Sequence, residues 1–119
     1  MSAPRRALDR HISESEWQRE VIAIAHAGGW SVMHVRRSRS SHLTATSLAG
    51  WPDLVLFRPG RLLFRELKRD GGKLRPEQAE VLDGLAAAGA DVDVWRPADR
   101  AKVEATLRGS RLLGAWTGR

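Results

Sequence analysis

Three charged residues near the middle of the chain, Asp53, Glu66 and Lys68, are of the types that hydrolyse phosphate esters. Carboxylates are ligands that Mg²⁺ prefers, with waters and substrate phosphate oxygens completing the shell. An ammonium group beside them can orient or activate water and can stabilise charge that builds on a phosphate. These residues act together only if the fold brings their side chains to one place.

A predicted β-hairpin brings them together. Residues 52–57 (PDLVLF) and 62–68 (LLFRELK) read as strands, and residues 58–61 (RPGR) read as a turn. If the hairpin pivots between Pro59 and Gly60, opposed residues have numbers that sum to 119, so Asp53 faces Glu66. Directly opposed residues have Cβ atoms about 4.5–5.5 Å apart. Because side chains alternate along a strand, Lys68 shares the face of Glu66.

Two carboxylates this close in a mostly apolar sheet repel each other, which predicts a compensating partner. A divalent cation bridging Asp53 and Glu66, with the backbone carbonyl of Leu67 completing its shell, is one remedy. Proton sharing between the carboxylates is another. A simpler interpretation also stands, in which Glu66 and Lys68 pair with each other as ordinary surface residues.

The surrounding pattern predicts an α/β fold. A first helix begins with a capping box, Ser13 with Glu16, and ends at Gly28. A second helix begins at Pro76 and joins the third strand to the fourth, a crossover that makes those strands parallel neighbours. Since the central strands are apolar on both faces, we expect helices on both sides. The other predicted elements are a strand at 30–35, a loop at 36–50, a strand at 91–95 and a helix at 97–107.

Composition limits the classes of protein to consider. The 119 residues fit one domain, with a basic arm at 1–12 and a tail from about 109 to 119. No apolar run reaches the length of a membrane span, no signal peptide is evident and cysteine is absent, so we expect a cytoplasmic protein. The net charge of +6 favours a polyanionic partner, of which nucleic acid is the commonest.

Two basic clusters are candidate DNA contacts. Arg36, Arg37 and Arg39 lie in the long loop, where guanidinium groups can bind phosphates without sequence preference. Lys73 and Arg75 flank the start of the second helix, whose amide groups favour anions. The alternative for the loop is a solvated segment without a ligand. Separately from these clusters, His34 on the first strand is a candidate to face the site, although a lone strand histidine is more often structural than catalytic.

Residues 50–97, with the Pro52-Asp53 pair and the Glu66-Leu67-Lys68 triplet, resemble the VRR-NUC family of the PD-(D/E)XK nuclease superfamily. The resemblance implies a restriction-endonuclease-like αβββαβ core with a mixed four-stranded sheet flanked by helices. It also implies that Asp53 and Glu66 bind Mg²⁺ or Mn²⁺ and that Lys68 is catalytic. Family members often carry a first-helix glutamate, for which Glu16 is the candidate and Glu20 the alternative. Gln78 matches a glutamine that follows the family's triplet.

The resemblance further implies a biological setting. Small members are frequent in phage and bacterial genomes and are similar to Holliday-junction resolvases, which act as dimers. We therefore predict a structure-selective DNA endonuclease acting on branched, flapped or junction DNA in a bacterial or phage-infected cell. A homodimer and partner proteins of replication, recombination or packaging are candidate assemblies. The competing hypotheses are a non-catalytic DNA-binding module and a nuclease subunit active only within a larger complex.

Overall fold

The computed structural model of the chain describes residues 12–35 and 49–109. Their elements follow in the predicted order, although most boundaries shift by one or two residues from the predicted ones. The predicted basic arm up to residue 11 and the tail from residue 110 lie outside the described residues. The elements are α2 (Glu14–Ala27), β1 (Ser31–His34), β2 (Leu54–Arg58), β3 (Arg61–Leu67), α3 (Pro76–Ala87), β4 (Asp91–Trp95), the short 3-10 helix η2 (Pro97–Asp99) and α4 (Arg100–Arg108).

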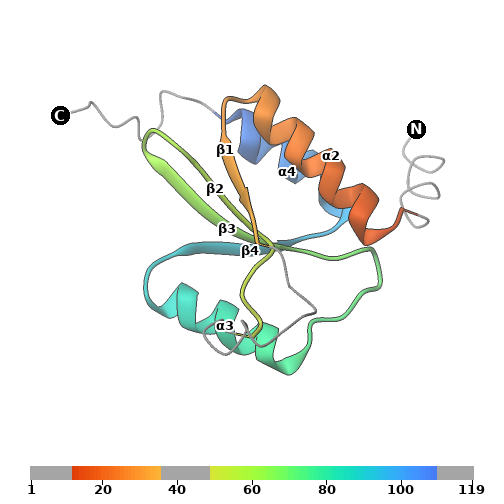
Figure 1. Cartoon of the computed structure of the whole chain (residues 1–119), viewed down its shortest axis with the longest axis vertical. Coiled ribbons are helices and arrows are strands. Elements are labelled where there is room, and N and C mark those ends of the chain that lie inside the picture. The colour runs from red at the N-terminus through yellow and green to blue at the C-terminus, as the bar shows by residue number, and fades with distance from the viewer. Residues whose placement is uncertain (1–11, 36–48, 110–119) are drawn as a thin grey trace.

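The four strands form one mixed sheet in the order β1-β2-β3-β4. β1 and β2 are antiparallel, as are β2 and β3, whereas β3 and β4 are parallel. Helix α3 makes the crossover between the two parallel strands. Figure 1 shows α2 and α4 together on one side of the sheet and α3 on the other. The predicted α/β fold with a mixed, helix-flanked sheet is therefore confirmed.

The β2–β3 hairpin has the predicted register. Arg58 pairs with Arg61 and Leu54 with Arg65, so the numbers of opposed residues sum to 119. Asp53 directly precedes β2, and the same register carried one residue further sets it opposite Glu66. The Asp53 carboxylate lies at the end of β3, where its Oδ2 accepts a hydrogen bond from the Leu67 amide at 2.9 Å.

The main core lies between the sheet and the α2–α4 pair. Two tryptophans anchor it through their ring nitrogens: Trp17 donates to the Trp95 carbonyl at 3.0 Å, and Trp30 donates to the Leu107 carbonyl at 2.7 Å. Burial of these aromatic groups and their aliphatic neighbours supplies most of the hydrophobic stabilisation. The core residues are Trp17, Val21, Ala25, Trp30, Leu54, Leu56, Leu63, Leu67, Trp95, Val103 and Leu107.

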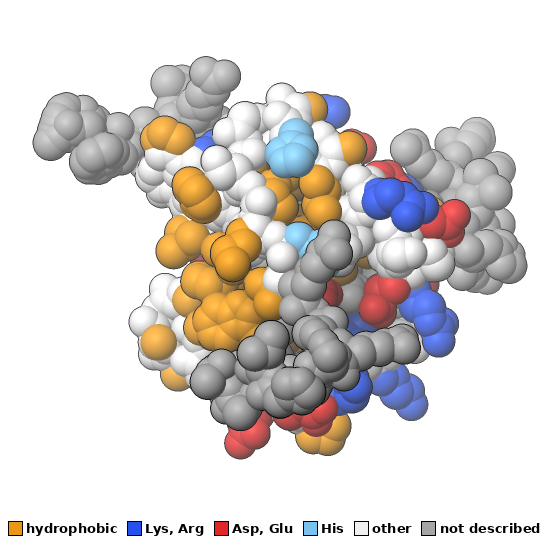
Figure 2. Space-filling view, in the orientation of Figure 1, with side chains coloured by type: hydrophobic (Ala, Val, Ile, Leu, Met, Phe, Trp, Pro, Cys, Tyr) orange, Lys and Arg blue, Asp and Glu red, His pale blue; other side chains and the backbone are white. Residues whose placement is uncertain are grey.

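The opposite face of the sheet is covered only in part. Helix α3 packs mainly against β4, which leaves the β1–β2 side of this face without a helix among the described residues. Met33, Phe57 and Leu62 are consequently 60%, 50% and 51% exposed. Figure 2 shows hydrophobic side chains gathered on this side of the molecule. Helices thus lie on both sides of the sheet, as expected, but among the described residues α3 covers only the β4 half of the second face, because one helix is too narrow to cover four strands.

Candidate active site

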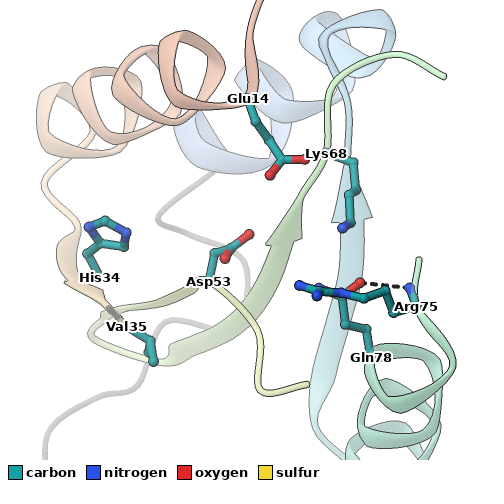
Figure 3. Close-up of a pocket in the computed structure, with 7 residues that line it drawn as sticks. All are labelled: Glu14, His34, Val35, Asp53, Lys68, Arg75 and Gln78. Carbon is teal, nitrogen blue, oxygen red and sulfur yellow. Dashed lines mark hydrogen bonds between the residues drawn. The ribbon is translucent and has the colours of Figure 1, made fainter. Parts of the chain in front are cut away.

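A cavity of about 400 Å³ opens at the end of the sheet where β3 stops and where α2 and α3 begin. Several elements meet there because β2 is antiparallel to both β1 and β3. The last residues of β1 and β3 therefore lie at the same end of the sheet as the first residue of β2. Figure 3 shows the side chains around this space. The lining residues are Glu14, His34, Val35, Asp53, Lys68, Arg75 and Gln78.

The predicted pair of carboxylates lies at this cavity at two depths. Asp53 is on the cavity wall, where its Oδ2 is bonded to the Leu67 amide. Within the described part of the chain, its Oδ1 has no hydrogen-bond donor. Glu66 is only 2% exposed and lies behind the lining residues rather than among them. The site therefore has one accessible carboxylate and one buried carboxylate.

Lys68 and Gln78 connect the buried carboxylate to the cavity. The Gln78 side-chain nitrogen donates to Glu66 Oε2 at 2.9 Å, and Lys68 Nζ lies 3.8 Å from the same oxygen. Gln78 also accepts a hydrogen bond from the Arg75 amide at 2.8 Å, which caps the start of α3. Gln78 is 1% exposed, so both of its amide atoms are held in fixed directions. The predicted residues Glu66, Lys68 and Gln78 thus form one connected group.

The first helix contributes a different glutamate from the one expected. Glu16 points back to its own cap, where it accepts a hydrogen bond from the Ser13 amide at 2.9 Å. That bond and a second one involving the Ser13 hydroxyl lower the pKa of Glu16. Glu20 instead forms a two-bonded ion pair with Arg100, at 2.6 and 2.8 Å. The carboxylate of the first helix that lines the cavity is Glu14.

Helical spacing in the sequence could have identified Glu14 as the glutamate that faces the cavity. It precedes the buried Trp17 by three residues and the buried Val21 by seven, so it lies on the inward stripe of the helix. The family resemblance predicted Glu16 for this role, but a glutamate that caps a helix has its carboxylate engaged at the helix start.

The predicted DNA-contacting residues divide into three groups. Arg75 lines the cavity and remains exposed, with a distance of 3.9 Å to the Glu77 carboxylate. Lys73 is exposed on the loop between β3 and α3 but does not line the cavity. Arg36, Arg37 and Arg39 lie outside the described residues.

The donor set at the cavity is compatible with a hard divalent cation. It offers an accessible Asp53 oxygen, the neighbouring Glu66 carboxylate and the backbone of Leu67, whose amide is bonded to Asp53. Among the described residues, no three side chains of His, Cys, Asp or Glu cluster closely enough to hold a metal ion by themselves. Such a set suits Mg²⁺, which commonly takes one or two carboxylates and completes its shell with water and substrate oxygens.

Comparison with solved structures places this arrangement in a known fold. A protein described as a "VRR_NUC domain protein" matches with a TM-score of 0.62, covering 90% of this chain and 94% of its own, at 21% sequence identity. The chain has the VRR_NUC fold. The match agrees with the family resemblance that residues 50–97 of the sequence predict. No family model and no curated protein matches the sequence itself.

The cavity lies where the β2–β3 hairpin and the start of α3 converge. Nothing among the described helices has the length and apolar character needed to cross a bilayer.

Proposed function

We propose that the chain is a metal-dependent endodeoxyribonuclease that hydrolyses phosphodiester bonds in branched, flapped or junction DNA. The observation that carries the proposal is the hairpin register, which sets Asp53 against the end of β3 beside Glu66 and Lys68. The VRR_NUC fold and the net charge of +6 support it, because a basic nuclease-like fold suits a polyanionic substrate.

Asp53, Glu66 and the Leu67 carbonyl would hold Mg²⁺ or Mn²⁺. When bound, such an ion lowers the pKa of its water and neutralises charge on the phosphate. Asp53 is suited to this role because one of its carboxylate oxygens is fixed by the Leu67 amide and the other faces no donor among the described residues.

Lys68 is the proposed catalytic cation. Its side chain is 10% exposed, so its charge is poorly screened by solvent and acts strongly on nearby groups. The nearby Glu66 carboxylate keeps the ammonium at the cavity wall. From there, Lys68 orients the attacking water or stabilises the charge that develops on the scissile phosphate.

Gln78 and Glu14 have supporting roles in the proposal. Gln78 is a positioning residue, because it holds Glu66 Oε2 and ties that oxygen to the capped start of α3. Glu14 takes the place expected for Glu16, with its carboxylate directed into the space that Asp53 and Lys68 share (Figure 3). It can accept a hydrogen bond from a water in the cavity.

The test is cleavage of end-labelled linear, nicked, flapped and four-way DNA in Mg²⁺, Mn²⁺ or EDTA. We expect Asp53→Asn and Lys68→Ala each to reduce cleavage by roughly a hundredfold or more, as loss of a group acting in the transition state does. Asp83→Asn, at an exposed position of α3, and Lys102→Ala, at an exposed position of α4, are the matched controls. Full activity of both site variants would contradict the assignment.

One observation favours a second function, a DNA-binding module without catalysis. Glu66 is nearly inaccessible and already contacts Lys68 and Gln78, an arrangement that also suits a structural ion pair. In that case the wild type binds all four DNAs with the same affinity in Mg²⁺ and EDTA and cuts none. A subunit that is active only in a larger complex would gain cleavage when its partner is supplied.

A further inference from the structure

His34 lies beside the proposed site but has no part in the roles assigned so far. It pairs with Leu54 in the β1–β2 ladder, and the next residue, Val35, donates its amide to the Asp53 carbonyl at 2.8 Å. The backbone that carries His34 is therefore fixed against the segment that carries Asp53. The His34 side chain lines the same cavity as Asp53 and Lys68.

The cavity has hydrogen-bond donors on two sides. Figure 3 shows Lys68, Arg75 and Gln78 on one side of Asp53, and His34 with Val35 on the other. Val35 has an apolar side chain, so among the described lining residues His34 is the side-chain donor on the β1 side. A phosphodiester strand that crosses the negative Asp53 carboxylate would therefore meet a hydrogen-bond donor on either side of it.

Gln18 of α2 fixes the orientation of the imidazole. Its side-chain nitrogen lies 2.9 Å from His34 Nε2. Because an amide nitrogen only donates, the neutral ring in this arrangement accepts at Nε2 and carries its proton on Nδ1. If the Gln18 side-chain amide is turned so that its oxygen faces Nε2, and the ring is doubly protonated, Nδ1 also carries a proton. Nδ1 becomes an acceptor only when the amide turns and the ring stays neutral.

The contact between Gln18 and His34 adds little to holding α2 on the sheet. That helix is already anchored by the buried Trp17, Val21 and Ala25, and by the bond from the Trp17 ring to the Trp95 carbonyl. His34 is exposed, and a hydrogen bond open to water contributes little net stability. In the described part of the chain, Gln18 is the one hydrogen-bond partner of the His34 ring. The remaining ring nitrogen has no partner among residues 12–35 and 49–109 and is therefore available to a ligand.

We propose that His34, oriented by Gln18, is a substrate-positioning residue that donates a hydrogen bond to a phosphate oxygen of the bound DNA strand on the β1 side of the site. The proposal rests on the proposed function for its substrate, but it concerns binding rather than the hydrolytic step. Lys68 and His34 would then hold the strand from opposite sides of Asp53.

The test measures binding of fluorescently labelled flapped DNA by anisotropy in EDTA, where cleavage does not interfere. His34→Ala should weaken binding by roughly ten- to a hundredfold, the usual cost of losing a hydrogen bond to a charged group. His34→Gln, which keeps a side-chain donor, should recover most of that loss. Gln18→Ala should give a smaller loss, because the ring remains but is no longer oriented. His26→Ala, at the exposed end of α2, is the control.

Each outcome separates this inference from the proposed function. If the wild type cleaves DNA and His34→Ala binds as tightly as His26→Ala, the inference is wrong and the nuclease stands. If the wild type never cleaves but His34→Ala loses affinity that His34→Gln restores, the inference holds and the nuclease proposal fails. A loss of affinity matched by an equal loss of thermal stability, without rescue by glutamine, would show a structural role and overturn the inference.

Discussion

Gly50 is the position where a single added methyl group should disturb the site most. Its φ of +90° is one that other residues avoid, and its α-carbon lies close to the start of α3. A Cβ built there would lie 2.3 Å from the Glu77 carbonyl oxygen and 2.6 Å from its carbon. Since both atoms are backbone, no side-chain rotation relieves the contact. Gly50→Ala must therefore push the segment before Asp53 away from α3.

The expected cost has two parts. Positive φ costs a residue with a Cβ about 1–2 kcal/mol, and overpacking against fixed atoms typically costs a further ~1–3 kcal/mol. We therefore expect the free energy of unfolding to fall by roughly 2–5 kcal/mol, a large share of the ~5–15 kcal/mol typical of a domain. Because the displaced atoms adjoin Gln78, cleavage should fall by more than the folded fraction alone explains.

Urea unfolding followed by tryptophan fluorescence measures this cost, and Gly29→Ala is the matched control. Gly29 has a similar φ of +80°, but a Cβ there meets no atom within 4 Å, so it reports the backbone strain without the collision. The difference between the two variants isolates the collision, which should be about 1–3 kcal/mol. If Gly50→Ala unfolds at the same urea concentration as Gly29→Ala, the tight docking of this segment on α3 is refuted.

Three further predictions follow from individual contacts. Gln78→Ala should lower the free energy of unfolding by roughly 1.5–3 kcal/mol, because it removes a buried hydrogen bond to the Glu66 carboxylate; urea unfolding measures this loss. The same variant should reduce cleavage but leave DNA affinity, measured by anisotropy, unchanged. Because the pKa of Glu16 is lowered in the folded state, its carboxylate stabilises α2 at pH values above the usual glutamate pKa, and this contribution is lost as the pH falls through the folded-state pKa. Glu16→Gln should therefore make the free energy of unfolding fall less steeply with decreasing pH. If the predicted homodimer uses the exposed apolar face, Phe57→Lys should shift the mass in analytical ultracentrifugation from dimer to monomer, and an unchanged dimer would exclude that face.

Local rules predicted much of the fold. The register of the hairpin followed from a four-residue turn, because once Arg58 opposes Arg61 every later pair is determined. The capping box of Ser13 and Glu16 is likewise a contact between residues three apart, and it is present as predicted. The parallel β3–β4 pair followed from the handedness and length of a crossover through a helix.

Contacts between distant elements decided the rest of the site. Which glutamate of α2 reaches the cavity depends on how that helix is rotated on the sheet, and the burial of Trp17 and Val21 sets that rotation. The Glu20 carboxylate forms an ion pair with Arg100, which is eighty residues away in sequence, and no local pattern indicates that pairing. The unequal depth of Asp53 and Glu66 depends on α3, since Gln78 covers Glu66 only when that helix packs against the sheet end.

The sequence by itself determined that Asp53, Glu66 and Lys68 meet on one face of a hairpin, because strand alternation and turn length are properties of short stretches of chain. Only the tertiary structure decided what surrounds them: Glu14 rather than Glu16 at the cavity, Gln78 over the buried carboxylate, and His34 across from Lys68. Those neighbours come from helices and strands far apart in sequence. Their approach depends on how whole elements pack, which the spacing of a few residues does not encode.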